Sequence, residues 1–361
     1  MNAKPSVLVA MSGGVDSSVS ATLLHEQGYR VVGEHIKLVH LDGVDHGCCG
    51  PRAEADAQAV ADMVGFEFRV VDMSATFEET VLADFFGEHR AGRTPNPCVR
   101  CNESIKFGAF LDRADALGFD FVATGHYART WRDGEGQWHL GRGLDRSKDQ
   151  SYVLHVLGQG QLARSLFPVG GQTKAETRAH AERLGLPVAA KPDSQEVCFV
   201  PGADHGAFLE RHAPDLVHAG EVVDPAGQVL AEHDGTFRFT VGQRRGLGVS
   251  TGQRMYVVDV DPGANRVVVG PGELLARRGL RADRVTWVAG EPPPGAPFEA
   301  HVRIRYRGED VPAAVEATGH DGAVVEFRSP QRGVAPGQSV VFYAGDEVLG
   351  GGRIAEALRS G

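Results

Sequence analysis

The chain has 361 residues, of which 42% are hydrophobic and 23% charged, so wholesale disorder is excluded and two or three soluble domains are expected. The formal net charge of −10 argues against a nucleic-acid partner, although an arginine-rich window at 236–285 weakens that argument. Five cysteines are too few for a disulfide scaffold. No apolar run has the length of a signal-peptide core or a membrane span, so we expect a cytoplasmic protein with reduced thiols.

Short apolar runs alternate with helical patterns over the first 190 residues or so. Strands are predicted at 7–11, 30–39, 67–73 and 119–125, and helices at 16–27, 52–63, 77–90 and 105–117. This alternation predicts a parallel sheet with helices on both faces. Two loops interrupt it, at 41–51 and at 92–103, and two prolines in the second argue against regular structure there.

From about residue 206, short strand-like runs separated by Gly and Pro turns dominate the sequence. They fall at 236–243, 254–261, 265–270, 300–308, 313–318, 323–329 and 339–345. Such spacing predicts small β-domains, the last of them barrel-like. We therefore expect an α/β fold with three domains: a parallel-sheet domain at 1–205, a mostly β central domain at 206–278, and a C-terminal β-barrel domain at 279–361.

The strongest local signal is SGGVDSS at 12–18, where a strand runs into a Ser/Gly turn and a helix follows. Gly13 and Gly14 allow a tight turn whose N–H groups, with the helix N-terminus, can bind an anion. Asp16 could help hold Mg²⁺ on a polyphosphate. The turn has no lysine and is not a Walker A loop, which favours pyrophosphate release over γ-phosphoryl transfer. The alternative is a capped helix after an ordinary turn.

The cysteines fall in three places. Adjacent Cys48 and Cys49 are best interpreted as inert buried residues. Cys98 and Cys101 form a C-x-x-C pair, which is compatible with half a zinc site, a redox pair or cluster ligands. Cys101 and Cys198 lie in polar segments bounded by prolines, which suits accessible thiolates. The sequence predicts no dedicated protein metal site.

The loop at 12–18 resembles the PP-loop of ATP pyrophosphatases, and the chain from end to end resembles the tRNA-specific 2-thiouridylase family. The segments that carry the resemblance are SGGVDSS (12–18), GRTPNPCVRCNESIKFG (92–108), ATGHYAR (123–129), KDQSY (148–152), DSQEVCFV (193–200), TVGQRRGLG (240–248), RIRYRG (303–308) and GVAPGQSVVFY (333–343). The resemblance implies an adenine nucleotide alpha hydrolase-like sheet domain. It also implies an enzyme that adenylates the C2 oxygen of the wobble uridine and replaces it with sulfur from a cysteine persulfide.

Site residues follow from the same resemblance. Cys101 is implied as the nucleophile and Cys198 as the persulfide carrier, and the pair could close to a disulfide or release hydrosulfide. The implied ATP contacts are Ala10, Met11, Ser12, Gly13, Gly14, Val15, Asp16, Ser17, Ile36 and Gly125. The implied tRNA contacts are His126, Lys148, Asp149, Gln150, Arg305, Tyr306 and Gln338. Arg244 and Arg245 are further phosphate candidates on charge alone.

One position departs from the family. Many members have Asp where this chain has Cys98, so Cys98, Cys101 and Cys198 also resemble the ligand set of iron–sulfur-dependent tRNA thiolation enzymes. Two other functions stay open: an amide-forming PP-loop synthetase and an RNA-binding module with a vestigial loop. The expected cofactors are ATP and Mg²⁺. The expected partners are the tRNAs for Lys, Glu and Gln and a cysteine desulfurase or sulfur-relay protein. The expected state is a monomer.

Overall fold

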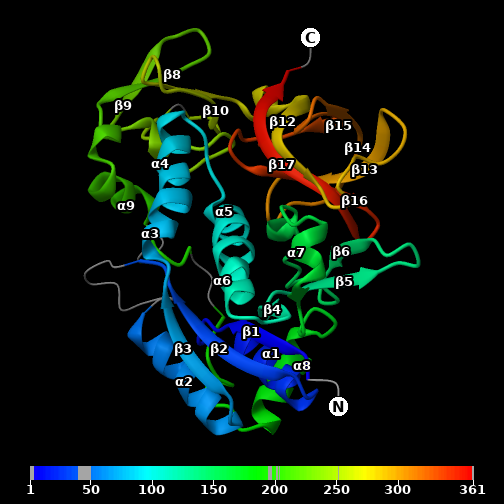
Figure 1. The fold of residues 1–361 in the computed structure, drawn as a ribbon. Helices are drawn as coiled ribbons and strands as arrows, with labels where there is room; N and C mark the ends of the chain where they lie inside the picture. Colours follow the sequence, from blue (N-terminus) through cyan, green and yellow to red (C-terminus); the bar gives the residue numbers. More distant parts are fainter. Residues whose placement is uncertain are drawn as a thin grey trace.

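The computed structural model describes residues 4–39, 50–193, 197–200, 202, 204–250 and 252–359. Three parts follow one another along the chain (Figure 1): an α/β part on a parallel sheet, a small middle β-domain and a C-terminal β-barrel. The predicted fold class is confirmed. Within the described ranges, no helix combines the length and the apolar composition needed to cross a membrane.

A five-stranded sheet in the order β3-β2-β1-β4-β7 forms the N-terminal part, and all of its pairings are parallel. Its strands are β1 (Ser6–Ala10), β2 (Arg30–Lys37), β3 (Glu67–Asp72), β4 (Phe121–Ala123) and β7 (Ser165–Leu166). Central β1 is apolar and fully buried from Val7 to Val9, as expected for a strand covered on both faces. The carboxyl ends of these strands share one edge, where open α/β sheets bind ligands.

The side chains of β1 alternate between two hydrophobic cores. Val7 and Val9 pack with residues of α1 (Val15–Glu26), α2 (Pro51–Val64) and α8 (Lys174–Arg183). Leu8 belongs to the other core, together with residues of the helical segments between 74 and 116. Helices therefore cover both faces of the sheet, as the alternating pattern predicts.

Two long helical runs cover the Leu8 face. They consist of α3 (Ser74–Phe77), the π-helical η1 (Glu78–Leu82), α4 (Ala83–Arg90), α5 (Pro97–Cys101), the π-helical η2 (Asn102–Ala109) and α6 (Phe110–Ala116). The predicted loop at 92–103 is therefore wrong in its second half. Pro97 is tolerated because it stands in the first helical turn, where its missing N–H has no partner to lose. Asn96 caps the helix by accepting the Cys98 N–H at 3.2 Å.

The middle domain follows α9 (His205–His212) and contains a four-stranded sheet in the order β10-β11-β8-β9. Its strands are β8 (Gly220–Val223), β9 (Val229–His233), β10 (Tyr256–Asp261) and β11 (Arg266–Gly270). The strand predicted at 236–243 is wrong: Thr236–Arg238 is a 3-10 turn and no ladder follows it. The alternation there has another cause. Phe237 packs in the core that contains Leu8, called the large core from here on, and Phe239 packs in the core of the middle domain.

Six antiparallel strands close into the C-terminal barrel. They are β12 (Arg277–Trp287), β13 (Phe298–Arg303), β14 (Val311–Thr318), β15 (Gly322–Gln331), β16 (Ser339–Ala344) and β17 (Glu347–Leu358). Closure comes from β12, which pairs with β15 on one side and with β17 on the other. Val302, Val325 and Phe342 are among the fully buried residues of its interior.

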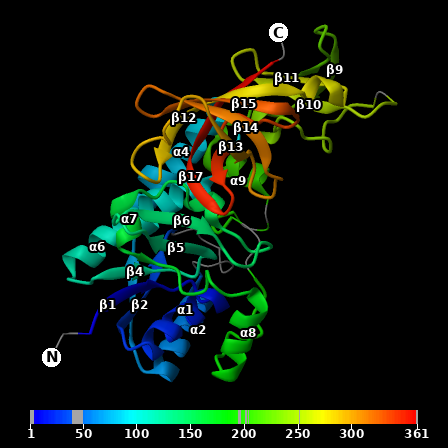
Figure 2. The ribbon, with the colours of Figure 1, turned by 90° about the vertical axis from the view of Figure 1, so that its right-hand side faces the viewer.

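A hairpin of the N-terminal part extends this barrel. It consists of β5 (Ala128–Arg132) and β6 (Trp138–Arg142), and β6 pairs with β17 through Leu140–Val348 and Gly141–Glu347. Figure 2 shows the hairpin between the parallel sheet and the barrel, next to α7 (Gln159–Ala163). No local sequence pattern indicates this pairing, which joins the first and last parts of the chain.

Candidate active site

The phosphate loop lies between β1 and α1 at the carboxyl edge of the sheet. Gly13 has φ +66°, and a Cβ there would lie 2.1 Å from the carbonyl oxygen of Ala53 in α2, so only glycine fits. Gly14 is the extended N-cap residue of α1 and offers no side-chain cap. Because glycine has no side chain, Gly14 cannot cap the first N–H groups of α1. These N–H groups suit an anionic ligand.

Neighbouring strands fix the shape of this loop. The Met11 N–H donates to the Glu34 carbonyl at 2.8 Å, and the His35 Nδ1 lies 2.9 Å from the Met11 carbonyl oxygen. Ile36, the expected nucleotide contact, follows on β2 and is half-buried. A Cβ at Gly125 would lie 2.6 Å from the Ser17 amide nitrogen, so the end of β4 packs directly on the loop.

Two lysines reach the phosphate loop from outside it, and sequence reasoning missed both. Lys174, the first residue of α8, places its Nζ 2.6 Å from Asp16 Oδ1. Lys191 donates to the Gly13 carbonyl at 2.8 Å and pairs with Asp56 at 2.6 Å. The absence of lysine from the turn itself is thus compensated from elements more than 150 residues away, and no local pattern could have indicated it.

A cation cluster surrounds Asp193, five residues before Cys198. Lys148, Lys174 and Arg178 all pair with its carboxylate, at 2.9, 2.9 and 2.8 Å. Partial burial alone would raise the pKa of Asp193, but hydrogen bonds from Lys174 and Lys148 lower it to about 2. Lys148, expected at a tRNA phosphate, therefore lies near the phosphate loop, joined to it through Asp193, Lys174 and Asp16.

The cysteines differ in exposure. Cys101 is only 7% exposed and lies on α5 in the large core, so the expectation of an accessible thiol in a loop is wrong for it. Cys198 is half-buried and packs against the same core, whereas Cys98 is exposed. Cys48 and Cys49 lie outside the described residues.

The possibility of a metal site with three protein ligands can be tested on the described residues. Across the described ranges, no three His, Cys, Asp or Glu side chains are grouped so as to hold a metal ion. The cysteines at 98, 101 and 198 therefore do not present a ready ligand set for an iron–sulfur cluster here. Asp16 offers Mg²⁺ a single carboxylate, whose Oδ1 already accepts from Lys174 and Tyr127.

Two of the expected tRNA contacts are buried. His126 is 7% exposed and lies 2.7 Å from the Thr124 hydroxyl; burial, and next the charge of Lys106, holds its pKa well below the ordinary value. Asp149 is also buried and accepts hydrogen bonds from the Gly143 and Ser151 N–H groups. The contacts of both side chains are therefore internal to the fold.

The other expected tRNA contacts divide into two kinds. Gln150 accepts the Tyr127 N–H at 2.9 Å, and Gln338 donates to the Thr94 carbonyl at 2.8 Å, so each joins two segments. Arg305 and Tyr306 are exposed on the loop after β13. The ring of Tyr306 is covered on one side by Tyr152, at 5.9 Å between ring centroids, and this partial burial raises the pKa of Tyr306.

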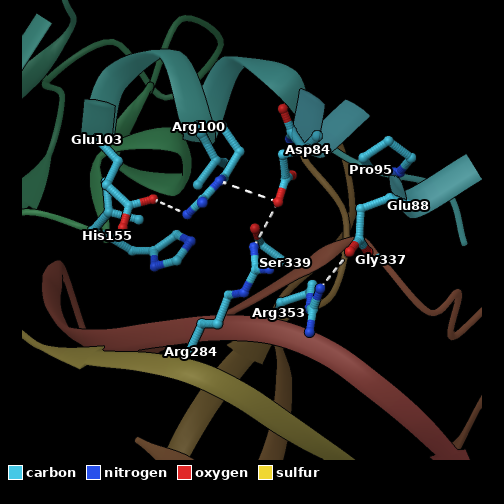
Figure 3. A pocket seen from close by; sticks show the side chains of 13 residues that line it. Asp84, Glu88, Pro95, Arg100, Glu103, His155, Arg284, Gly337, Ser339 and Arg353 are labelled. Carbon is cyan, nitrogen blue, oxygen red and sulfur yellow. Dashed lines mark hydrogen bonds and ion pairs between the residues drawn. The ribbon is translucent and has the colours of Figure 1, made fainter. Parts of the chain in front are cut away.

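A small polar pocket separates α4 and α5 from the barrel (Figure 3). Buried Glu88 accepts both donors of the Arg93 fork at 2.7 Å and also pairs with Arg353 of β17. Asp84 pairs with Arg284 of β12 at 2.7 Å. Acidic and basic side chains alternate across the gap, so the pocket is a charged seam that docks the barrel on α4.

A nucleotide loop at the carboxyl edge of a parallel sheet, with lysines around it and two thiol-bearing segments on one core, defines a PP-loop enzyme of the ATP-binding class. Family models agree with this class. Residues 5–202 match a model described as tRNA methyl transferase HUP domain, residues 206–271 a tRNA methyl transferase PRC-barrel domain, and residues 277–354 an aminomethyltransferase beta-barrel domain.

Curated relatives narrow the assignment. A tRNA-specific 2-thiouridylase MnmA from Geobacter metallireducens is 50% identical over 99% of both chains, and one from Acidothermus cellulolyticus is 49% identical over 98% of both. This chain belongs to the tRNA-specific 2-thiouridylase family. A solved 4-thiouridine synthetase–RNA complex with bound ATP covers 57% of this chain and 49% of its own, at 16% identity and a TM-score of 0.35, too low to carry an argument.

Proposed function

We propose that this chain catalyses the ATP-dependent 2-thiolation of the wobble uridine of tRNA, giving 2-thiouridine, AMP and pyrophosphate. One observation carries the proposal: the Cys198 segment is joined to the phosphate loop. Asp193 pairs with Lys174, Lys174 pairs with Asp16 of the loop, and Cys198 packs on the core that contains Cys101. These links support our assignment of the nucleotide loop and the two thiols to one site.

Adenylation uses the loop and its lysines. The Gly13–Gly14 turn and the N-terminus of α1 bind the phosphates, while Lys174 and Lys191 neutralise the leaving pyrophosphate. The uridine C2 oxygen attacks the α-phosphorus and becomes part of a good leaving group. Mg²⁺ fits beside Asp16 because it commonly takes one carboxylate with phosphate and water oxygens, and it supplies further charge neutralisation.

Sulfur transfer uses the two cysteines. The terminal sulfur of a Cys198 persulfide is delivered to C2, AMP leaves, and the Cys101 thiolate attacks Cys198 Sγ to release that sulfur. The products are 2-thiouridine and a Cys101–Cys198 disulfide. Because Cys101 is 7% exposed, we expect it to meet its partner sulfur within the protein rather than in solvent.

Recognition of tRNA is assigned to the exposed basic and aromatic residues. Arg305 contacts phosphate and Tyr306 stacks on a base. An open hollow of the middle domain, lined by Arg244 and Arg254, extends the phosphate-binding surface. The proposed partners are the tRNAs for Lys, Glu and Gln and a cysteine desulfurase or sulfur-relay protein, with the enzyme acting as a cytoplasmic monomer.

The experiment combines the purified protein with unmodified tRNA(Glu) transcript, Mg-ATP and a sulfur donor, and detects nucleosides by mass spectrometry. We expect 2-thiouridine only with ATP, and none from Cys101→Ser or Cys198→Ser, both of which should still bind tRNA. Full activity of either variant would refute its role. Absence of both 2-thiouridine and tRNA-dependent AMP from the wild type would refute the thiolation reaction and favour an amide-forming synthetase.

An iron–sulfur route is the alternative within this function. It would use Cys98, Cys101 and Cys198 as three ligands and leave one iron position open for sulfur. Iron and acid-labile sulfide analysis of anaerobically purified protein separates the two routes, since the persulfide route needs neither iron nor acid-labile sulfide.

A further inference from the structure

A Cys101–Cys198 disulfide must be reduced before the enzyme can turn over again, and its position makes this difficult. Cys101 is 7% exposed in the large core, and Cys198 is half-buried against that core. A reductant must approach a disulfide sulfur along the S–S axis, so direct attack by an external thiolate on Cys101 is obstructed. Cys198 is open to such attack only in part, so an exposed thiol next to Cys101 would offer a less obstructed route.

Cys98 provides such a thiol. It is the exposed residue among the three described cysteines and stands one helical turn before Cys101 on α5. Resting on the thiolation function proposed above, we propose that Cys98 is the resolving thiol that attacks Cys101 in the Cys101–Cys198 disulfide. The C-x-x-C pair is then a redox pair in series with the sulfur-transfer pair.

Helix geometry allows the exchange. Side chains three residues apart on a helix have Cβ atoms about 5–6 Å apart, and a disulfide needs about 3.5–4.5 Å. Cys98 is the second residue of α5, where the Asn96 side chain accepts its N–H at the start of the first turn. A shift of one to two ångströms in that turn closes the bond, while Cys101 stays fixed in the core.

The step balances without an added oxidant. The Cys98 thiolate forms a bond to Cys101 Sγ, the Cys101–Cys198 bond breaks, and Cys198 leaves as a thiolate that takes up a proton. Cys198 is then ready for the next persulfide. The resulting Cys98–Cys101 disulfide has one exposed sulfur, which a small protein dithiol reductant can attack, so the two electrons come from that dithiol.

The test compares the wild type with Cys98→Ser in a rapid-quench thiolation assay with limiting protein dithiol reductant. For Cys98→Ser we expect a burst of one 2-thiouridine per enzyme and a steady-state rate at least about tenfold below the wild type. Non-reducing peptide mapping should show accumulated Cys101–Cys198 linkage in the variant and trapped Cys98–Cys101 linkage in the wild type. Glu103→Gln, on the same helical run, controls for disturbance of that run and should keep the wild-type ratio.

A second measurement does not depend on activity. Protein carrying the preformed Cys101–Cys198 disulfide is exposed to limiting dithiol, and recovery of the Cys198 thiol is followed by alkylation. We expect recovery to slow at least about tenfold in Cys98→Ser. Equal recovery in both proteins overturns the proposal, as does joint loss of the burst and of bound iron in the variant, which would make Cys98 a cluster ligand. A wild type that makes no 2-thiouridine overturns the thiolation function itself.

Discussion

Glycines decide the geometry of the phosphate loop at the scale of single residues. Gly13 and Gly125 are each placed where a Cβ would meet backbone atoms at 2.1 and 2.6 Å. The sequence predicted the role of Gly13, because a Ser/Gly turn between strand and helix is a local pattern. It did not predict from residues alone why Gly125 must be glycine, since that contact joins β4 to α1 across the sheet.

Gly125→Ala should weaken ATP binding. The new Cβ would lie 2.6 Å from the Ser17 amide nitrogen, and because the obstacle is backbone, the loop itself must shift. We expect at least about a tenfold loss of affinity, which corresponds to about 1.4 kcal/mol, measured by calorimetric titration. Gly87→Ala is the matched control: nothing lies within 4 Å of its Cβ, and alanine in α4 should leave affinity unchanged.

Lys174→Met should slow adenylation. The Lys174 ammonium joins Asp16 and Asp193, and its loss leaves two neighbouring carboxylates without that cation where a polyphosphate must bind. We expect tRNA-dependent AMP formation to fall by about 10²-fold, in line with the loss of one preorganised electrostatic contact. Arg183→Gln, at the exposed end of α8, should retain activity. A Lys174→Met enzyme with unchanged AMP formation would remove this lysine from the phosphate site.

At the scale of elements, helix α5 shows why the loop predicted at 92–103 was wrong in its second half. Two prolines in 92–103 favoured a loop, yet Pro97 and the Asn96 cap begin a helix that places Cys98 outside and Cys101 inside. The prediction considered the low helix propensity of proline but not its position. Proline disrupts the interior of a helix but is well tolerated in the first turn, where Pro97 stands. The exposed and buried thiols could not be told apart until the helix was known.

The seam between α4 and the barrel should be sensitive to charge. Glu88 is 4% exposed, accepts two hydrogen bonds from the Arg93 guanidinium and pairs with Arg353. Glu88→Gln therefore leaves both arginines without the carboxylate that they share. We expect the free energy of unfolding to fall by about 3–5 kcal/mol, as measured by equilibrium denaturation in guanidinium chloride. Glu79→Gln, on the exposed side of the same helical run, should change it by less than about 0.5 kcal/mol. Similar losses in both variants would contradict a specific seam.

Over the whole molecule, local patterns predicted the parallel sheet and the barrel but not how they join. Both architectures leave repeating signals within short windows. The β6–β17 pairing and the charged seam connect segments more than 200 residues apart, and such contacts leave no local pattern in the sequence. For the same reason the lysines of the phosphate site, which come from distant elements, were missed.

Acid should destabilise the fold through buried neutral histidines. Burial lowers the pKa of His155, in the seam, to about 4. Between pH 6.5 and 4 the unfolded chain binds a proton that the folded chain does not, so stability falls as the pH falls, by about 1.4 kcal/mol per pH unit for this residue. His155→Gln should flatten the dependence measured by guanidinium unfolding at pH 6.5 and 5. His25→Gln, a substitution at an exposed site, should leave the pH dependence as it is in the wild type. Equal dependence of stability on pH in the wild type and both variants would contradict the role assigned to His155.

The hairpin that joins β17 has a consequence for modularity. Its two strands begin just after His126 and end just before the segment that carries Lys148, so the catalytic part completes its structure with the last strand of the chain. A gene fragment that stopped before the barrel would expose the β6 edge and uncover Leu140 and Tyr152, which are fully buried here. Such an open edge invites aggregation. We therefore expect the N-terminal part to be stably expressed only together with the barrel, although the two lie far apart along the sequence.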